Sequence, residues 1–339
     1  MVNEVPPAAV AAVAGQGVAG NGVDAAAGAD GMRDVVAERA QRSARAAAAP
    51  LRLMAVHAHP DDESSKGAAT LAKYSAAGAG VMVVSCTGGE RGEILNPKYQ
   101  VTDEPMSEVR KREMARAADI LGVDHVWLGY QDSGYHEGPP ETWELPEGCF
   151  GALDPRAETE ALVRLVRTFR PHVMITYDEQ GGYPHPDHIR CHVVSVGAFE
   201  ASADPDAFPD AGEPWQVLKL YYHGGFSRAR LRAVNEAVRA RTGEGPFDEW
   251  IAHMDERNRS DRSEKITTRI AASEYFGVRD AALRAHETQI DPDAHWFAIP
   301  HDIEAQAWGT DDYELARSLV DSPLPEDDLF AGVAERVSP

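Results

Sequence analysis

The chain has 339 residues, 43% of them hydrophobic, which is enough for a sizeable core in one large or two modest domains. Its formal net charge of −22 argues against nucleic acid or an anionic membrane as the main partner, because both attract basic surfaces. Three widely spaced cysteines without a CxxC pair, and the lack of any apolar run of about 18 residues, favour a cytoplasmic protein in a reducing compartment.

The first 50 residues differ in composition from the rest. They contain 17 alanines and 6 glycines, and no Leu, Ile, Phe, Trp or Tyr. Such a segment buries too little surface to offset the entropy lost on ordering. We therefore expect residues 1–50 to be a disordered extension, with at most a weak helix over 33–49. A folded domain over 51–310 and an acidic C-terminal tail over 311–339 are expected to follow.

From residue 51 onward, short apolar runs of strand length alternate with helical patterns. The predicted strands are 51–57, 81–86, 125–130, 171–177 and 219–223, and the predicted helices are 65–77, 107–121, 157–169 and one that begins at Pro186. Strands this apolar, separated by helices, predict a parallel sheet that is covered on both faces. The expected α/β fold is a doubly wound, Rossmann-like, mostly parallel sheet, with a helical C-terminal portion from about Arg228 packed beside it.

Two loops dense in groups that bind metals or move protons follow the first and fourth predicted strands. The first reads His59-Pro-Asp-Asp-Glu63 and the second Tyr183-Pro-His-Pro-Asp-His188. In the strand order 3-2-1-4-5, strands one and four are neighbours at the topological switch point, where doubly wound sheets bind their ligands. The two loops are therefore predicted to face each other.

These residue types suit a mononuclear metal site. His59, Asp62 and His188 offer two imidazoles and one carboxylate, the set that zinc takes in catalytic sites with a fourth position for water. The same ligands also suit Fe(II). Asp61 is then the candidate general base for that water. A helix-capping role for the Asp pair is the simpler alternative; the presence of both loops favours one zinc per chain.

The segments Ala58-His-Pro-Asp-Asp-Glu63 and His185-Pro-Asp-His188 closely resemble the AHPDDE and HPDH motifs of the LmbE/PIG-L family of zinc-dependent N-deacetylases and amidases. The resemblance runs from about Leu51 to Pro300 and includes the segment from Ala285 to Pro292. It implies amide hydrolysis by a fixed set of residues. In that set His59, Asp62 and His188 hold zinc, Asp61 is the base, Tyr183 donates to the oxyanion, His185 stabilises the intermediate or protonates the leaving amine, and Asp187 orients a histidine.

Within the family, the sequence is most similar to amidases that act on mycothiol S-conjugates. The resemblance implies that Lys66 contacts the cysteinyl part of such a conjugate, and that Glu90, Arg110 and Asp132 contact its sugar or inositol. The expected partner is thus a small thiol–sugar conjugate. Two alternatives stay open: deacetylation of N-acetylglucosaminyl-inositol, and a non-catalytic protein that binds such conjugates. A homo-oligomer is possible, and the oligomeric state is left open.

Overall fold

The computed structural model describes residues 29–225, 227–256, 262–294, 297–333 and 336. Its strands are β1 (Arg52–His57), β2 (Gly80–Thr87), β3 (Asp124–Tyr130), β4 (Val173–Thr176), β5 (Lys219–His223), β6 (Thr268–Ala271) and β7 (Thr310–Ser318). Its α-helices are α1 (Ala29–Ala48), α2 (Asp62–Ser65), α3 (Ala68–Ala76), α4 (Met106–Leu121), α5 (Pro155–Phe169), α6 (Pro186–Ala201), α7 (Arg228–Thr242), α8 (Asp248–Glu256), α9 (Phe276–Ala285) and α10 (His301–Trp308). None of the helices described here is both long and apolar enough to cross a bilayer.

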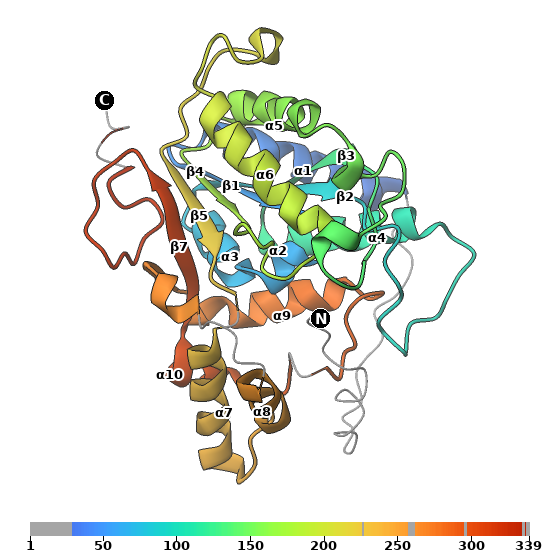
Figure 1. Cartoon of the computed structure of the whole chain (residues 1–339), viewed down its shortest axis with the longest axis vertical. Helices are drawn as coiled ribbons and strands as arrows, with labels where there is room; N and C mark the ends of the chain where they lie inside the picture. The colour runs from blue at the N-terminus through green and yellow to red at the C-terminus, as the bar shows by residue number, and fades with distance from the viewer. Residues whose placement is uncertain (1–28, 226, 257–261, 295–296, 334–335, 337–339) are drawn as a thin grey trace.

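The strands form one seven-stranded sheet in the order β3-β2-β1-β4-β5-β7-β6 (Figure 1). The first five strands are parallel, and β1 pairs with β4 in the register Leu53↔Val173. The predicted doubly wound fold is therefore confirmed, including the contact between the first and fourth strands. Because both strands end at the same edge of the sheet, the two loops that follow them start side by side.

Each face of the sheet has its own hydrophobic core. On one face, the strands bury Leu53, Val83 and Ile175 together with side chains of α3, α4 and α9. On the other face, Met54, Val56 and other strand residues pack against α5 and α6. Figure 1 shows the same arrangement of helices on both sides of the sheet. The near-continuous apolar character of the strands follows from this burial on both faces.

Three local signals place the helices close to the predicted positions. Gly122 ends α4 at φ 71°, a left-handed conformation that suits glycine after a helix. Pro155 and Pro186 start α5 and α6, where the missing proline N–H costs no hydrogen bond. The helix predicted over 65–77 begins only at Ala68, as α3, because the chain turns at Gly67 (φ 82°) after the short helix α2. A Cβ at Gly67 would lie 2.6 Å from the Tyr313 hydroxyl, so the turn also needs the small residue.

The weak helix expected over 33–49 is present as α1 (Ala29–Ala48), but the expectation that this segment belongs to a disordered extension was wrong, because α1 packs on the domain. Its C-terminal end buries Ala46, and a Cβ at Gly80 of β2 would lie 2.1 Å from the Ala46 carbonyl oxygen. Arg39 pairs with Asp119 of α4 at 2.5 Å. Alanine has the highest helix propensity, and small side chains on both partners permit close approach, so large apolar residues are not required. Residues 1–28 of the expected extension lie outside the described part of the chain.

The acidic tail was also a wrong expectation. Residues 310–318 form β7, which pairs antiparallel with β5 and β6, and Leu329, Phe330 and Val333 are buried in the core. Acidic residues are rare in strands, so the acidic sequence of β7 did not predict a strand. Asp311 accepts the Thr70 backbone N–H (3.0 Å) and so caps α3.

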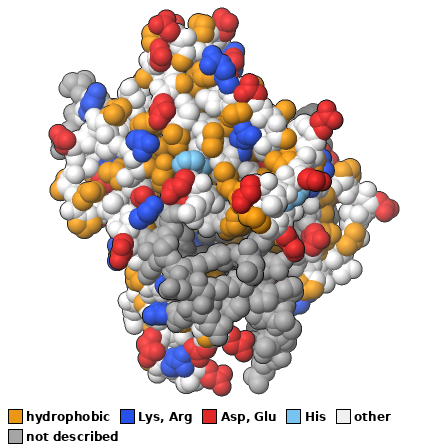
Figure 2. Space-filling model, viewed as in Figure 1, with side chains coloured by type: hydrophobic (Ala, Val, Ile, Leu, Met, Phe, Trp, Pro, Cys, Tyr) orange, Lys and Arg blue, Asp and Glu red, His pale blue; other side chains and the backbone are white. Residues whose placement is uncertain are grey.

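The predicted helical C-terminal portion consists of α9 on the sheet and a smaller group of helices beside it. Side chains of α7, α8 and α10 share a separate core that includes Leu231 and Ile303. Figure 2 shows acidic and basic side chains interspersed with hydrophobic ones over the face that it draws.

Candidate active site

The two loops that follow β1 and β4 meet at the carboxyl edge of the sheet. The first loop leads from His59 into the short helix α2, which begins at Asp62, and the second leads into the first turn of α6, which carries His188. His188 is fully buried, and His59 is 9% exposed. Residues 129 positions apart in the sequence are thus in direct contact.

Three donor atoms converge at this point. His59 Nδ1 lies 3.3 Å from His188 Nε2 and 3.6 Å from Asp62 Oδ2, and His188 Nε2 lies 3.4 Å from Asp62 Oδ2. A tetrahedral zinc ion with bonds of about 2.0–2.1 Å separates its ligand atoms by about 3.4 Å. The predicted ligand triad therefore fits a zinc-sized ion.

His185 belongs to a second possible set of ligands. A ligand atom of His185 lies within 4.8 Å of those of His59 and His188. Its Nδ1 accepts the backbone N–H of Asp187 (3.2 Å), which leaves Nε2 as the available nitrogen. Asp62 Oδ2 lies 3.6 Å from His59 Nδ1 and 3.4 Å from His188 Nε2, which are ligand–ligand separations of a tetrahedral zinc site, so Asp62 stays the predicted third ligand.

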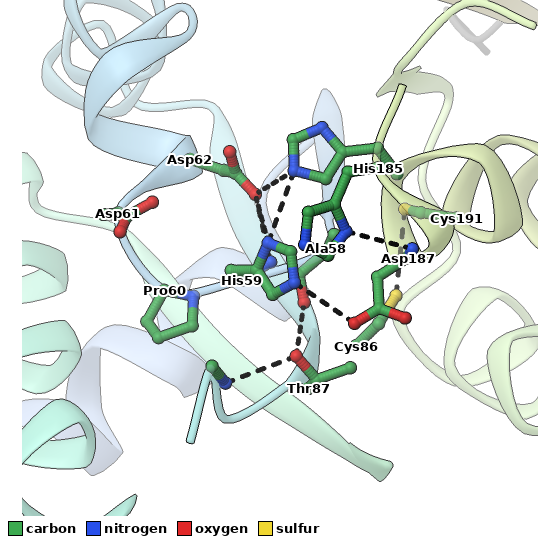
Figure 3. Close-up of polar contacts among 12 residues, drawn as sticks. Ala58, His59, Pro60, Asp61, Asp62, Cys86, Thr87, His185, Asp187 and Cys191 are labelled. Atoms are coloured by element: carbon green, nitrogen blue, oxygen red, sulfur yellow. Dashed lines mark hydrogen bonds and ion pairs between the residues drawn. The ribbon is translucent and has the colours of Figure 1, made fainter. Parts of the chain in front are cut away.

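Further contacts fix the orientation of both imidazoles. His59 Nε2 donates to Asp187 Oδ2 (3.2 Å) and lies 3.5 Å from Asp132 Oδ1, as Figure 3 shows for Asp187. His188 Nδ1 donates to the Gly181 carbonyl oxygen (2.9 Å). Each ring therefore turns its other nitrogen to the common point, which is how metal-binding histidines are usually held. Asp187 contacts His59, and the orienting role that the resemblance implies for it stays a prediction.

Burial and neighbouring charges set different protonation states. Burial lowers the pKa of His188 to about 3, which keeps its ring neutral. For His59 burial acts in the same direction, but hydrogen bonds to Asp132, Asp187 and Asp62 outweigh it and raise the pKa of His59 well above its ordinary value. Three carboxylates thus surround His59, an arrangement of charge that favours a cation.

Asp62 is enclosed by hydrogen-bond donors. Its Oδ1 accepts from Lys66 Nζ (2.5 Å), and its Oδ2 accepts from the Tyr177 hydroxyl (2.6 Å) and the His59 backbone N–H (3.0 Å). Burial raises the pKa of Asp62, but Lys66, His188 and His59 together lower it well below its ordinary value. Tyr177 ends the fourth predicted strand, and the sequence pattern did not predict the hydrogen bond from its hydroxyl to Asp62.

Asp61 points away from the triad. Its backbone adopts φ 106°, which for a residue with a Cβ costs about 1–2 kcal/mol. Its Oδ2 accepts from Arg110 Nη2 (2.6 Å), and Figure 3 draws no contact between it and the adjacent Asp62. Burial, opposed by Arg110, raises the pKa of Asp61, which moves this carboxylate toward the range of a general base.

The four positions expected to contact substrate lie around this centre. Arg110 is only 3% exposed and also donates to the carbonyl oxygens of Pro60 (2.5 Å) and Gly89 (2.9 Å). Asp132 is buried beside His59, and Glu90 accepts its backbone N–H (3.0 Å). The Lys66 ammonium donates to Asp62. Each already has a protein partner, and their contacts with substrate stay predictions.

The two remaining catalytic candidates lie over the triad. The Tyr183 ring is 4.5 Å from that of His188, and burial raises the pKa of its hydroxyl well above the ordinary value, so it stays a donor. The His185 ring lies 4.6 Å from that of His59, and burial together with His59 lowers its pKa to about 2. Both therefore present neutral hydrogen-bonding groups at the centre.

Sequence reasoning missed a buried ion pair next to the general-base candidate. Glu63 Oε1 accepts from His286 Nε2 (2.8 Å), and both side chains are fully buried. Burial opposes charge on each of them, but their mutual attraction lowers the pKa of Glu63 to about 2 and raises that of His286. Both residues stand in the motifs that carry the resemblance, and this position was the only indication in the sequence that they belong to the site.

Fold and site together define an α/β protein with a three-residue metal-type site at the switch point of its sheet. A family model described as PIG-L, GlcNAc-PI de-N-acetylase, matches residues 54–199. A Streptomyces coelicolor protein named mycothiol S-conjugate amidase is 52% identical over 290 residues, which cover 84% of this chain and 98% of the relative. The chain therefore belongs to the PIG-L/LmbE family of amidases and deacetylases.

One further relative and one solved structure are also similar to the chain. A Streptomyces avermitilis protein named 1D-myo-inositol 2-acetamido-2-deoxy-α-D-glucopyranoside deacetylase is 40% identical over 300 residues, covering 84% of this chain and 97% of the relative. The solved N,N′-diacetylchitobiose deacetylase from Pyrococcus horikoshii shares the fold with a TM-score of 0.53 at 15% identity, covering 86% of this chain and 94% of that one.

Proposed function

We propose that this chain is a zinc-dependent amidase that cleaves the amide bond of mycothiol S-conjugates, releasing an N-acetylcysteine S-conjugate and glucosaminyl-inositol. The observation that carries the chemistry is the convergence of His59, Asp62 and His188 with Asp61 next to them. The observation that favours this amide is the 52% identity to a relative of that name, against 40% to the deacetylase.

The chain's own residues would divide the reaction as follows. Zinc, when bound, lowers the pKa of a water molecule to about 7 and polarises the amide carbonyl. Asp61 accepts the proton of that water, and Tyr183 donates to the developing oxyanion. His185 accepts the Asp187 N–H at Nδ1, so its neutral ring offers Nε2–H to stabilise the tetrahedral intermediate. Asp61 is then the group that returns the proton to the leaving amine.

The decisive test compares two substrates. The purified protein is loaded with zinc and incubated separately with a bimane conjugate of mycothiol and with N-acetylglucosaminyl-inositol. We expect a higher kcat/KM for release of N-acetylcysteine bimane than for release of acetate. Faster acetate release would assign the chain to the deacetylases, and an inert protein that binds no metal would support a non-catalytic binding role.

A substitution of Lys66 tests the choice of substrate more directly, because its ammonium donates to Asp62, a ligand of the proposed metal. If its ammonium contacts the cysteinyl part of the conjugate, Lys66→Ala should raise KM for the conjugate about 10-fold, the size of a charge-assisted hydrogen bond. Because Lys66 also donates to Asp62, zinc affinity should fall, so both activities are measured at saturating zinc, where any slow deacetylation should change little. An equal loss of both activities at saturating zinc would mean that Lys66 acts only through Asp62.

A further inference from the structure

The backbone of Asp61 is held in its left-handed conformation by the side chain of Glu63. Glu63 Oε2 accepts the Asp61 backbone N–H (2.9 Å), and its other oxygen, Oε1, accepts from His286 Nε2 (2.8 Å) and Ser64 Oγ (2.5 Å). The carboxylate of Glu63 thus connects the general-base candidate with His286, which lies 223 positions after Glu63 in the chain. With the Asp61 N–H, His286 and Ser64 as its donors, Glu63 has little freedom to move.

His286 is itself held firmly where α9 ends. Its backbone N–H donates to the Leu283 carbonyl oxygen (3.1 Å), and its carbonyl oxygen accepts from Gln289 (3.0 Å). Two residues on, the backbone N–H and Oγ1 of Thr288 both donate to Glu113 (2.7 and 2.8 Å). The segment that carries His286 is therefore fixed by α4 as well as by α9.

Helix α4 consequently acts on Asp61 by two routes. Arg110, one turn before Glu113 on the same helix, contacts the Asp61 carboxylate directly. Glu113 fixes the Thr288 segment, and through His286 and Glu63 this segment contacts the Asp61 backbone. One route orients the carboxylate and the other orients the main chain that carries it.

We propose that His286 and Glu63 are positioning residues for the general base: their buried contact holds the Asp61 main chain in the conformation from which its carboxylate acts as the base. This inference rests on the proposed function, because it needs Asp61 as the base. Neither residue contacts the metal triad through its own side chain in any contact described above. Their loss should therefore change the rate of the chemical step more than substrate binding or metal content.

Two substitutions of His286 by amide side chains distinguish a positioning role, which needs the hydrogen bond to Glu63, from a role that any polar side chain could fill. The amide nitrogen of Gln reaches the place of Nε2, which donates to Glu63, whereas that of Asn reaches the place of Nδ1, which has no hydrogen-bond partner among the described residues. His286→Gln should keep kcat within about 3-fold of the wild type. His286→Asn should lower kcat about 10- to 100-fold, as expected for a small misplacement of a catalytic group.

The same measurements exclude the competing explanations. KM for the bimane conjugate and bound zinc per chain should equal the wild-type values in both variants, and urea unfolding should show similar stability losses, since both lose the charge of His286. If the pair only stabilises the fold, kcat per zinc-loaded chain would be the same in both variants, and this result would overturn the proposal.

Glu63→Gln keeps the test decisive if His286→Asn does not fold. Its amide oxygen can still accept the Asp61 N–H, but its contact with His286 is weakened, so we expect an intermediate loss of kcat at unchanged KM. An unchanged kcat would overturn the proposal. A wild-type protein that releases no N-acetylcysteine bimane would instead refute the proposed function, which separates the two failures.

Discussion

Two adjacent glycines allow the geometry of the metal site to be tested with a matched control. Gly181 and Gly182 both have positive φ, at 72° and 74°. A Cβ at Gly181 would lie 2.6 Å from the Cβ of His188 and 3.1 Å from its carbonyl carbon, whereas a Cβ at Gly182 would meet nothing within 4 Å. The Gly181 carbonyl also accepts from His188 Nδ1. Only Gly181→Ala should therefore disturb the metal site.

The expected magnitudes follow from these contacts. Both alanine variants should lose about 1 kcal/mol of unfolding free energy, the cost of a Cβ in the left-handed region. Gly181→Ala should in addition displace His188, because a backbone atom cannot swing aside as a flexible side chain does. Loss of such a supporting contact lowers metal affinity about 10- to 100-fold, which corresponds to about 1.4–2.7 kcal/mol.

The assay is competition for zinc against a chelator of known affinity, with urea unfolding of the metal-free proteins alongside. Gly182→Ala should bind zinc as tightly as the wild type, and Gly181→Ala should bind it more weakly. Equal zinc affinities for the two variants would refute the assignment of His188 as a ligand oriented by Gly181.

Two other predictions concern single carboxylates. Asp61→Asn should lower turnover about 10²-fold with zinc content intact, since Asn tolerates positive φ; equal loss of zinc, by elemental analysis, would make Asp61 a ligand. Burial raises the pKa of Glu158 from 4.5 to about 7 although Arg190 Nη1, 3.5 Å from Oε2, opposes this shift, and neither carboxylate oxygen has a hydrogen-bond partner among the described residues. The folded state then binds a proton that the unfolded state releases between these values, so this group lowers stability as pH rises from 4.5 to 7. Glu158→Gln should therefore stabilise the protein by about 1–3 kcal/mol at pH 8 but little at pH 4.5, as measured by urea unfolding; equal effects at both pH values would contradict this.

Much of the fold follows from local pattern. Strands β1, β2, β4 and β5 are largely buried, so their apolar runs stand out in the sequence, and the alternation with helices predicts a parallel sheet. The remaining elements lack that signal. Helix α1 packs through alanines, and β7 carries acidic residues that cap α3 and pair at the sheet, so both resembled solvent-exposed segments.

The same division applies to the site. The sequence by itself determined which segments carry the proposed ligands, because the motif with His59 and Asp62 follows β1 directly and the motif with His188 starts α6. Only the tertiary structure decided what holds these groups in place. Arg110 contacts Asp61, and His286 contacts Glu63, because α4 and α9 pack together on one face of the sheet. Such pairings depend on how distant elements pack, and local sequence patterns do not encode that packing.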